Sequence, residues 1–457
     1  MDKLANSPFK AYDIRGRIPD QLNADRARRI GLAYAEVVRP HGPIAIGRDI
    51  RQSSEEIAGA VAEGLNAAGV ETRDIGLCGT EVVYHAASLS GMGGGIMVTA
   101  SHNPADYNGM KMVREQAIPI SADTGLAEIE AQVVRSSRAG RGIIAGRHRP
   151  LSVFDDYVAR VRSLVDIAAL KPLKLVVNAG NGCAGPAFDA IAEGLPLEVI
   201  RLNHQPDGGF PNGVPNPLLP ENRSVTAQAV IEHGADFAVA WDGDYDRCFF
   251  FDHQGRFIEG YYLVGLFAVQ LLEKHPGEAI ILDPRLTWNT LEEVARAGGR
   301  ALINKSGHAF IKERMRAENA LYGGEMSAHH YFRDFAYCDS GMIPWLLVAE
   351  RVSVSGRSLA ELVDERIEAF PCSGEINFEV EEDPAAVMDR IVEQFSADKP
   401  RLDRTDGISL EFPRWRFNLR ASNTEPVIRL NVETRADRAL LDEKTELLGR
   451  LIRNPNG

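Results

Sequence analysis

Four short polar segments carry most of the side chains that could do chemistry. The first is TASHNP, where Ser101 and His102 follow the short apolar stretch 95–99. A serine beside a histidine can be a nucleophile with its base. We favour another interpretation, in which His102 only orients the loop through hydrogen bonds, because a base next to its nucleophile in sequence usually points elsewhere on a turning backbone.

The second segment, DGDYDR, places Asp242, Asp244 and Asp246 at alternating positions. Three carboxylates this close repel one another unless a cation lies among them, and hard oxygen ligands favour Mg²⁺ or Ca²⁺. An EF-hand loop needs glycine and glutamate where this chain has Arg247 and His253. The segment therefore predicts a divalent-cation site of another kind, with a solvated acidic turn as the alternative.

The third and fourth segments carry groups that bind hydroxyls and oxyanions. GGEMSAHH combines Glu325, Ser327 and two histidines, a set that hydrogen-bonds sugar hydroxyls but also suits a polar surface turn. RASNTEP, residues 420–426, combines a guanidinium, two hydroxyls and an amide. Arginine with such donors and backbone N–H groups holds phosphate oxygens.

The elements that must position these segments alternate between strand-like and helix-like patterns. Asn23 is an expected helix N-cap before the strand 44–46, and Ser53 or Ser54 caps the helix that precedes the strand at 95–99. This βαβ pattern occurs twice more. Later strands are expected at 175–177, 197–200, 237–240, 280–282, 301–303 and 320–322, with helices ending near 234, at 288–297 and from about 309. Polar loops follow the carboxyl ends of strands, where open parallel sheets bind ligands.

From about Gly374 the order becomes strand, helix, three strands and helix, which is an α+β pattern. The predicted fold class is therefore α/β, with three consecutive similar α/β domains of mixed sheets flanked by helices and a C-terminal α+β domain. Proline-rich and polar stretches near 147–150 and 370–371 mark expected boundaries. The predicted domains are 1–148, 149–252, 253–368 and 369–457.

Composition excludes several classes of protein. The chain has 457 residues, is 44% hydrophobic and can bury several cores. Its net charge of −13 argues against a nucleic-acid partner. Five scattered cysteines without a CxxC pair imply neither a disulfide framework nor a zinc site. The sequence has neither a long apolar run nor a signal-peptide pattern, so we expect a cytoplasmic protein with no membrane partner.

TASHNP, DGDYDR, GEMSAH and RASNTEP, in this order and at these separations, resemble the α-D-phosphohexomutase superfamily along essentially the whole chain. AYDIRG, GRDIRQSS, PDGGFPNGVPNPLLPEN and KSGHAFIK support the match. The GEMS form is similar to the bacterial phosphomannomutase/phosphoglucomutase branch. The resemblance implies four domains around a central cleft, the last a smaller, mobile phosphate-binding lid.

The resemblance also implies a role for each segment. Ser101 would carry a phosphate, and Asp242, Asp244 and Asp246 would bind Mg²⁺ together with an oxygen on Ser101. Arg247 and Arg15 would neutralise the transferring phosphoryl group. Three side chains remain open candidates for proton transfer: Lys111, His308 and His329. The expected substrate-binding residues are Tyr12, Arg285, Glu325, Ser327, Arg420, Ser422, Asn423 and Thr424.

The implied reaction is the reversible conversion of hexose 6-phosphate to hexose 1-phosphate, for mannose and also glucose, through a hexose 1,6-bisphosphate. Glucose 1,6-bisphosphate would serve as activator, and small phosphosugars would be the partners. A metal-dependent phosphomonoesterase is the rival enzyme, but it would not need the sugar and phosphate segments. A sugar-phosphate sensor without chemistry is a third alternative, against which the intact Ser101 and three aspartates argue.

Overall fold

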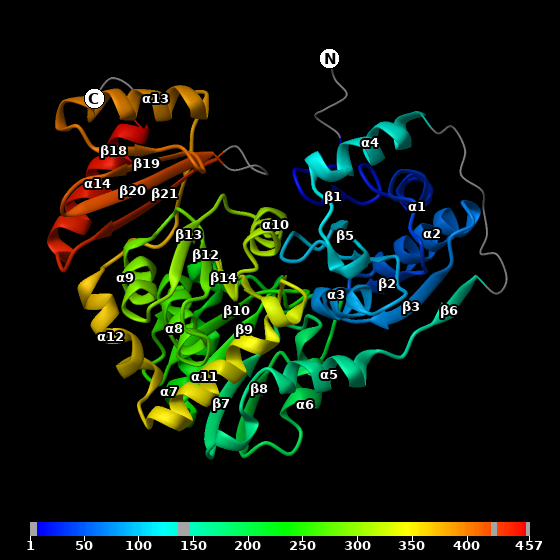
Figure 1. The fold of residues 1–457 in the computed structure, drawn as a ribbon, viewed down its shortest axis with the longest axis horizontal. Helices are drawn as coiled ribbons and strands as arrows, with labels where there is room; N and C mark the ends of the chain where they lie inside the picture. Colours follow the sequence, from blue (N-terminus) through cyan, green and yellow to red (C-terminus); the bar gives the residue numbers. More distant parts are fainter. Residues whose placement is uncertain (1–6, 136–146, 422–426, 454–457) are drawn as a thin grey trace. The chain divides into compact units, whose positions relative to one another are not determined.

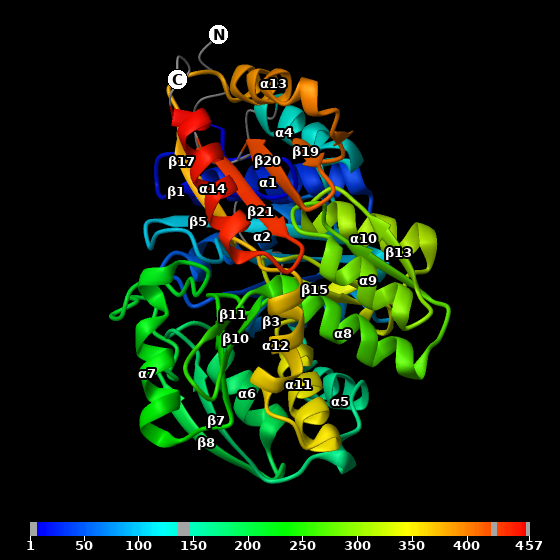
Figure 2. The same cartoon turned by 90° about the vertical axis from the view of Figure 1, so that its left-hand side faces the viewer.

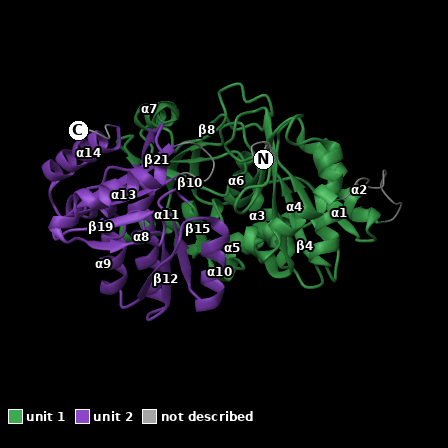
Figure 3. Ribbon diagram, turned by 90° about the horizontal axis from the view of Figure 1, so that it is seen from above, with its two compact units in different colours: residues 1–257, 329–356 green, residues 258–328, 357–457 purple. Residues whose placement is uncertain are grey.

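The computed structural model describes residues 7–135, 147–421 and 427–453. Contacts divide the chain into two compact units, shown in Figure 3. Unit 1 comprises Met1–Phe257 and His329–Gly356, and unit 2 comprises Ile258–Ala328 and Arg357–Gly457. Within the described ranges, no helix is both long and apolar enough to cross a membrane.

The first sheet of unit 1 has the strand order β1-β5-β4-β2-β3-β6, in blue and cyan in Figure 1. Strands β2, β3, β4 and β6 run parallel, whereas β5 is antiparallel to β1 and β4. The strands are β1 (Ile14–Arg17), β2 (Ile44–Arg48), β3 (Thr72–Leu77), β4 (Gly94–Val98), β5 (Tyr107–Arg114) and β6 (His148–Pro150). The helices are α1 (Ala24–Val38), α2 (Ser54–Ala67), α3 (Thr80–Ser88) and α4 (Leu126–Arg135).

Local chemistry sets the bounds of the first helix pair. Asn23 caps α1 as predicted, its side-chain oxygen accepting from the backbone N–H of Arg26 at 3.0 Å. Glycines let α1 and α2 approach closely, because a Cβ on Gly31 would lie 2.3 Å from the carbonyl oxygen of Val61. The apolar faces of these helices join the buried core of this first sheet.

The second sheet of unit 1 has the order β11-β10-β9-β7-β8, in which β10 turns back antiparallel to β9. Its strands are β7 (Leu173–Asn178), β8 (Leu197–Leu202), β9 (Phe237–Trp241), β10 (Cys248–Asp252) and β11 (Phe257–Ile258). The helices are α5 (Phe154–Ser163), α6 (Ala184–Ala192) and α7 (Ser224–His233). Unit 1 also contains the antiparallel pair β15 (His330–Phe332) and β16 (Cys338–Asp339), followed by α11 (Met342–Ser355). Segment DGDYDR is thus the turn between two fully buried strands, β9 and β10.

Unit 2 begins with the parallel strands β13, β12 and β14, in that order. The strands are β12 (Ala279–Leu282), β13 (Arg300–Ile303) and β14 (Tyr322–Gly324). The helices are α8 (Gly260–Lys274), α9 (Trp288–Arg296), α10 (His308–Glu318) and α12 (Leu359–Ala369). The third polar segment therefore follows the carboxyl end of β14, as the sequence pattern predicts.

The last part of unit 2 is an antiparallel sheet in the order β17-β21-β20-β19-β18. Its strands are β17 (Ile376–Glu379), β18 (Arg401–Asp403), β19 (Ile408–Glu411), β20 (Trp415–Ala421) and β21 (Val427–Thr434). Helices α13 (Pro384–Gln394) and α14 (Arg438–Arg453) pack against it, as Figure 2 shows for α14. The expectation of three strands after α13 was wrong by one. The short β18 is largely exposed and has no alternating apolar residues, so its sequence carries no strand signal.

Candidate active site

Ser101 lies in a buried loop directly after β4. Its backbone has a φ of 50°, in the left-handed region that non-glycine residues rarely adopt. Its side chain is only 2% exposed, and its backbone N–H donates to Thr99 Oγ1 at 2.9 Å. Such strain costs of order 1–3 kcal/mol and persists only where the surroundings fix it. The surroundings must therefore hold this hydroxyl in one orientation.

Arg51 is the residue that fixes the loop, and sequence reasoning missed it. Its guanidinium donates to four backbone carbonyls of the segment that contains Ser101, at 2.6–3.0 Å: those of Ser101, Asn103, Pro104 and Tyr107. Asp49 pairs with the same guanidinium at 3.3 Å and accepts from Thr99 Oγ1 at 2.7 Å. The available signal was that Asp49 and Arg51 closely follow the strand β2. Buried charged side chains need polar partners, so these two residues could have been expected to bind another part of the chain.

The three aspartates of DGDYDR are the next part of the site in unit 1. They are at most 1% exposed, and one carboxylate oxygen from each lies within 4.8 Å of the others. Ser101 Oγ donates to Asp242 Oδ2 at 2.7 Å, and Arg247 Nε donates to the same oxygen at 2.8 Å. The fold therefore brings the serine and the aspartates together, with the guanidinium of Arg247 beside them.

The remaining carboxylate oxygens fit a cation. Oδ1 of Asp244 and Oδ1 of Asp246 are buried with no hydrogen-bond partner among the described residues. Buried carboxylate oxygens are normally satisfied, so these two are acceptors that a bound cation would satisfy. Burial and then the negative charge of Asp244 raise the pKa of Asp246 to about 6, because crowded carboxylates repel one another.

Lys111, on β5, supplies positive charge to this cluster. Its ammonium donates to Asp244 Oδ2 at 2.7 Å and also to Asp246 Oδ2. Burial lowers the pKa of Lys111, but Asp244 and Asp246 outweigh that effect, and the pKa lies above its ordinary value. Lys111 is thus a protonated donor in this arrangement and not a free base.

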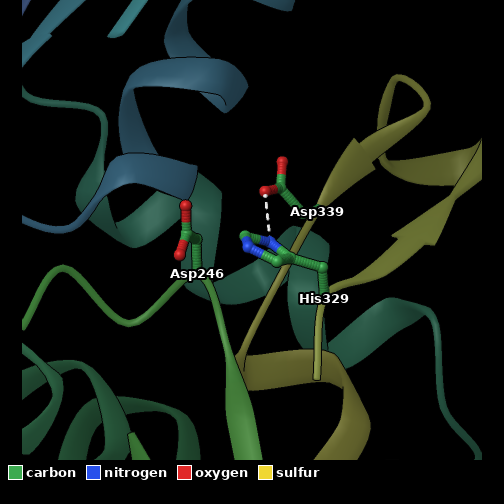
Figure 4. A group of neighbouring side chains, drawn as sticks. All are labelled: Asp246, His329 and Asp339. Carbon is green, nitrogen blue, oxygen red and sulfur yellow. Dashed lines mark hydrogen bonds and ion pairs between the residues drawn. The ribbon is translucent and has the colours of Figure 1, made fainter. Parts of the chain in front are cut away.

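His329 lies on the other side of Asp246, directly before β15. Figure 4 shows its ring between Asp246 and Asp339, with a contact from Nδ1 to Asp339 Oδ2 of 3.1 Å. Asp339 is fully buried and fixes the ring by this contact. Sequence reasoning missed Asp339, since its segment carries no recognisable motif.

His102 lies within hydrogen-bonding reach of Ser101, but the ring nitrogen that faces the serine has another partner. Its Nδ1 lies 3.1 Å from Ser101 Oγ and also accepts from the guanidinium of Arg247. Burial and then Arg247 lower the pKa of His102 well below its ordinary value. A nitrogen that accepts from a guanidinium is not available to a second proton, so the contacts of His102 fit a loop orienter.

Arg15 and Tyr12 lie at the first strand of unit 1. Arg15, on β1, donates from NH1 to Asn103 Oδ1 at 2.7 Å and from Nε to Asp13 Oδ2 at 2.8 Å. Tyr12 lies two residues before β1. Arg15 is therefore positioned against the loop of Ser101.

Unit 2 holds the predicted sugar residues around Arg285. The guanidinium of Arg285 lies 3.4 Å from Glu325 Oε1 and 3.2 Å from Ser327 Oγ. Asp283 orients it with two contacts, at 3.0 and 2.8 Å. His308 is the first residue of α10, directly after Gly307, whose N–H donates to Glu325 Oε1 at 2.9 Å. The third segment and Arg285 thus form one polar group.

The phosphate segment is described only at its start. Arg420 is on β20, and its NH2 donates to Glu375 Oε2 at 3.3 Å. Its Nε is buried with no hydrogen-bond partner among the described residues. Ser422, Asn423 and Thr424 lie outside the described residues. Their predicted role in binding phosphate stays a prediction.

Models of four protein-family domains match the chain in order. They are described as phosphoglucomutase/phosphomannomutase alpha/beta/alpha domains I, II and III and the C-terminal domain, and they match residues 6–139, 155–255, 259–370 and 375–448. With the observed sheets, these matches confirm the predicted fold class of three α/β domains and a C-terminal α+β domain.

Curated relatives and a solved structure are similar along the whole chain. A protein of Xanthomonas campestris pv. campestris described as phosphohexose mutases is 61% identical, covering 97% of this chain and 99% of the relative. A phosphomannomutase of Salmonella montevideo is 57% identical, covering 97% and 98%. The crystal structure of a phosphoglucomutase/phosphomannomutase family protein from Burkholderia thailandensis has a TM-score of 0.86 at 34% identity and covers 98% of both chains.

Proposed function

The chain belongs to the phosphoglucomutase/phosphomannomutase family and is a mutase, an isomerase acting on hexose phosphates; we propose that it transfers the phosphate through a phosphoserine at Ser101. Hexose 6-phosphate and hexose 1-phosphate, of mannose and glucose, would interconvert through a hexose 1,6-bisphosphate. The observation that carries this proposal is the hydrogen bond from the buried Ser101 Oγ to Asp242, 2.7 Å long, within a group of charged side chains.

Phosphoryl transfer needs positioning and charge neutralisation more than covalent chemistry by the protein. Arg51 provides the positioning, because it holds the backbone carbonyls of Ser101 and Asn103. Arg247 lies beside the same carboxylate as Ser101 and can neutralise the transferring group. Arg15 contacts the side chain of Asn103 in the same loop and can do the same.

The aspartates fit Mg²⁺ by the chemistry of their oxygens. We assign Asp242, Asp244, Asp246 and an oxygen on phosphorylated Ser101 as its ligands, since the two Oδ1 atoms of Asp244 and Asp246 have no partner among the described residues. When bound, Mg²⁺ supplies charge neutralisation for the phosphoryl group. Lys111 meanwhile supplies an ammonium to the same two carboxylates.

Each transfer forms a bond from phosphorus to a sugar oxygen and breaks the bond from phosphorus to Ser101 Oγ, or the reverse. The sugar hydroxyl loses its proton as it attacks, and Ser101 gains one as it departs. We favour His329 as the acceptor of the sugar proton, because its contact with the buried Asp339 fixes the orientation of the ring beside the aspartate cluster. Lys111 is protonated and is the candidate donor, with His308 as the remaining alternative.

The polar group around Arg285 fits the sugar. Glu325 and Ser327 would bind the hydroxyls at C3 and C4, and Arg420 with the residues after it would hold the phosphate that is not transferred. A structure of N-acetylphosphoglucosamine mutase from Aspergillus fumigatus contains glucose 1,6-bisphosphate; it shares the fold at 14% identity and a TM-score of 0.57. A hexose bisphosphate is therefore a ligand that this fold can hold.

A coupled assay with mannose 1-phosphate and glucose 1-phosphate, with and without catalytic glucose 1,6-bisphosphate, tests the proposal. Active enzyme should carry one extra phosphoryl group, mapped by mass spectrometry to the Ser101 peptide. Ser101→Ala should lose that mass and nearly all turnover, whereas Ser163→Ala, at an exposed hydroxyl, should keep both. Full activity of Ser101→Ala would refute the mechanism, and release of inorganic phosphate without isomerisation would favour the phosphomonoesterase.

A further inference from the structure

A largely buried carboxylate, Glu375, lies among three arginines of unit 2. Its Oε2 is 3.4 Å from NH1 of Arg285 and 3.3 Å from NH2 of Arg420, and its Oε1 is 3.3 Å from NH1 of Arg429. The side chain of Glu375 is 7% exposed and that of Arg285 is 2% exposed. One carboxylate thus meets three guanidiniums in a place with little water to screen their charges.

Two arginines face each other across neighbouring strands of the last sheet, and Glu375 lies beside them. Arg420 on β20 and Arg429 on β21 stand directly opposite each other in the antiparallel ladder. Like charges at such a position destabilise a sheet, because their side chains share one face. Glu375 directly precedes β17, which pairs with β21 at Ile376 and Leu430. The chain therefore places a carboxylate near the same end of the sheet as the two arginines.

Glu375 is charged at neutral pH. Burial raises its pKa, but Arg285, Arg429 and Arg420 outweigh burial, and the pKa lies below its ordinary value. Asp283 already binds Arg285 through two contacts, whereas Glu375 is the carboxylate that contacts Arg420 among the described residues. The charge of Glu375 therefore bears most directly on Arg420.

We propose that Glu375 is an internal counter-ion of the phosphate site: it balances Arg420, Arg429 and Arg285 without substrate and weakens their hold on a bound phosphate. The inference rests on the proposed function, which takes Arg420 as a phosphate-binding residue and Arg285 as a substrate-binding residue. A phosphate oxygen and Glu375 Oε2 would share the guanidinium of Arg420. The contact with Glu375 therefore lowers the affinity of Arg420 for phosphate.

A mutase has a physical reason to limit this affinity. The bisphosphate must leave the arginines and return with its other end between the two transfers. Binding that is equally strong before and during the chemical step lowers KM without raising kcat. Without the charge of Glu375, the arginines would hold the bisphosphate longer, and turnover would then be limited by its release.

Titration calorimetry of the whole protein with inorganic phosphate tests the proposal without any turnover. Glu375→Gln keeps the size of the side chain and removes its charge, so phosphate affinity should rise about tenfold. Glu379→Gln makes the same charge change at an exposed position of β17 and should leave the affinity unchanged. In the coupled assay, Glu375→Gln should lower both KM for glucose 1-phosphate and kcat, whereas Glu375→Asp should recover part of the wild-type behaviour.

The double variant Glu375→Gln/Arg429→Gln restores the charge balance and should return phosphate affinity toward the wild-type value. If Glu375→Gln alone does not fold, the double variant should fold, and failure of both would show that Glu375 serves packing. That failure would overturn the proposal, as would unchanged or weaker phosphate binding by folded Glu375→Gln. Absence of isomerisation by the wild type would instead refute the proposed function and leave the titration valid.

Discussion

Replacing Arg51 tests whether the strained backbone at Ser101 depends on distant contacts. Arg51→Met removes the donors to four backbone carbonyls and leaves the buried Asp49 without its guanidinium. Removing one partner of a buried ion pair typically costs about 3–5 kcal/mol, a large share of the stability of an ordinary domain. Arg51→Met should therefore lower the free energy of unfolding by about that amount.

Arg51→Lys separates charge from geometry. An ammonium keeps the pairing with Asp49, but its donors radiate from one atom and cannot span the carbonyls from Ser101 to Tyr107. Loss of two hydrogen bonds to a charged group, at about 1.5 kcal/mol each, would misplace the Ser101 hydroxyl and lower kcat roughly hundredfold. Stability should fall less than in Arg51→Met.

Chemical denaturation and the coupled mutase assay measure both effects, and intact mass gives the phosphorylated fraction of each variant. Arg73→Lys is the matched control, because Arg73 pairs with Glu71 at a more exposed site and such pairs contribute about 0–1 kcal/mol. Wild-type kcat in folded Arg51→Lys would refute the reasoning that the guanidinium positions Ser101.

Four further predictions concern other parts of the molecule. Chelation should abolish activity, Mg²⁺ should restore it, and Asp242→Asn should be inactive but folded by circular dichroism; a chelator-resistant enzyme would contradict the metal assignment. Arg420→Ala should lower kcat/KM by an amount equivalent to about 2–4 kcal/mol of transition-state stabilisation, because a hydrogen bond to a charged group is lost and the phosphate is left unpaired. Unchanged kinetics would show that Arg420 does not bind the phosphate. Burial raises the pKa of Glu81 to about 8 in the folded protein. Its contribution to the free energy of unfolding is therefore fully present below the unfolded pKa and is lost as pH rises through about 8. Denaturation from pH 5 to 9 should show the wild type losing stability relative to Glu81→Gln, and parallel curves for the two proteins would contradict this. Glucose 1-phosphate and mannose 1-phosphate differ at C2, which Glu325 and Ser327 would not read, so their kcat/KM values should agree within about 1–2 kcal/mol, and a hundredfold gap would refute the proposed sugar contacts.

The sequence alone determined the features that depend on neighbours along the chain. Asn23 at a helix start, the buried run before Ser101 and the alternating aspartates are patterns within a few residues. Hydrophobic periodicity and capping act over that same range, so many of the elements and the polar loops after the strands were predictable, although β3, α3, β5 and β10 were not predicted. The short strand β18 was missed because its three residues, two of them exposed, carry no such pattern.

The tertiary structure alone decided which distant side chains meet. Arg51 reaches the carbonyls near Ser101 because β2 and β4 are adjacent in the sheet, and Lys111 enters the aspartate cluster from β5. The same holds for Asp339 beside His329 and for Glu375 among three arginines. These pairings depend on strand order and register, which arise from packing of the whole core and leave no signal in the spacing of residues along the chain.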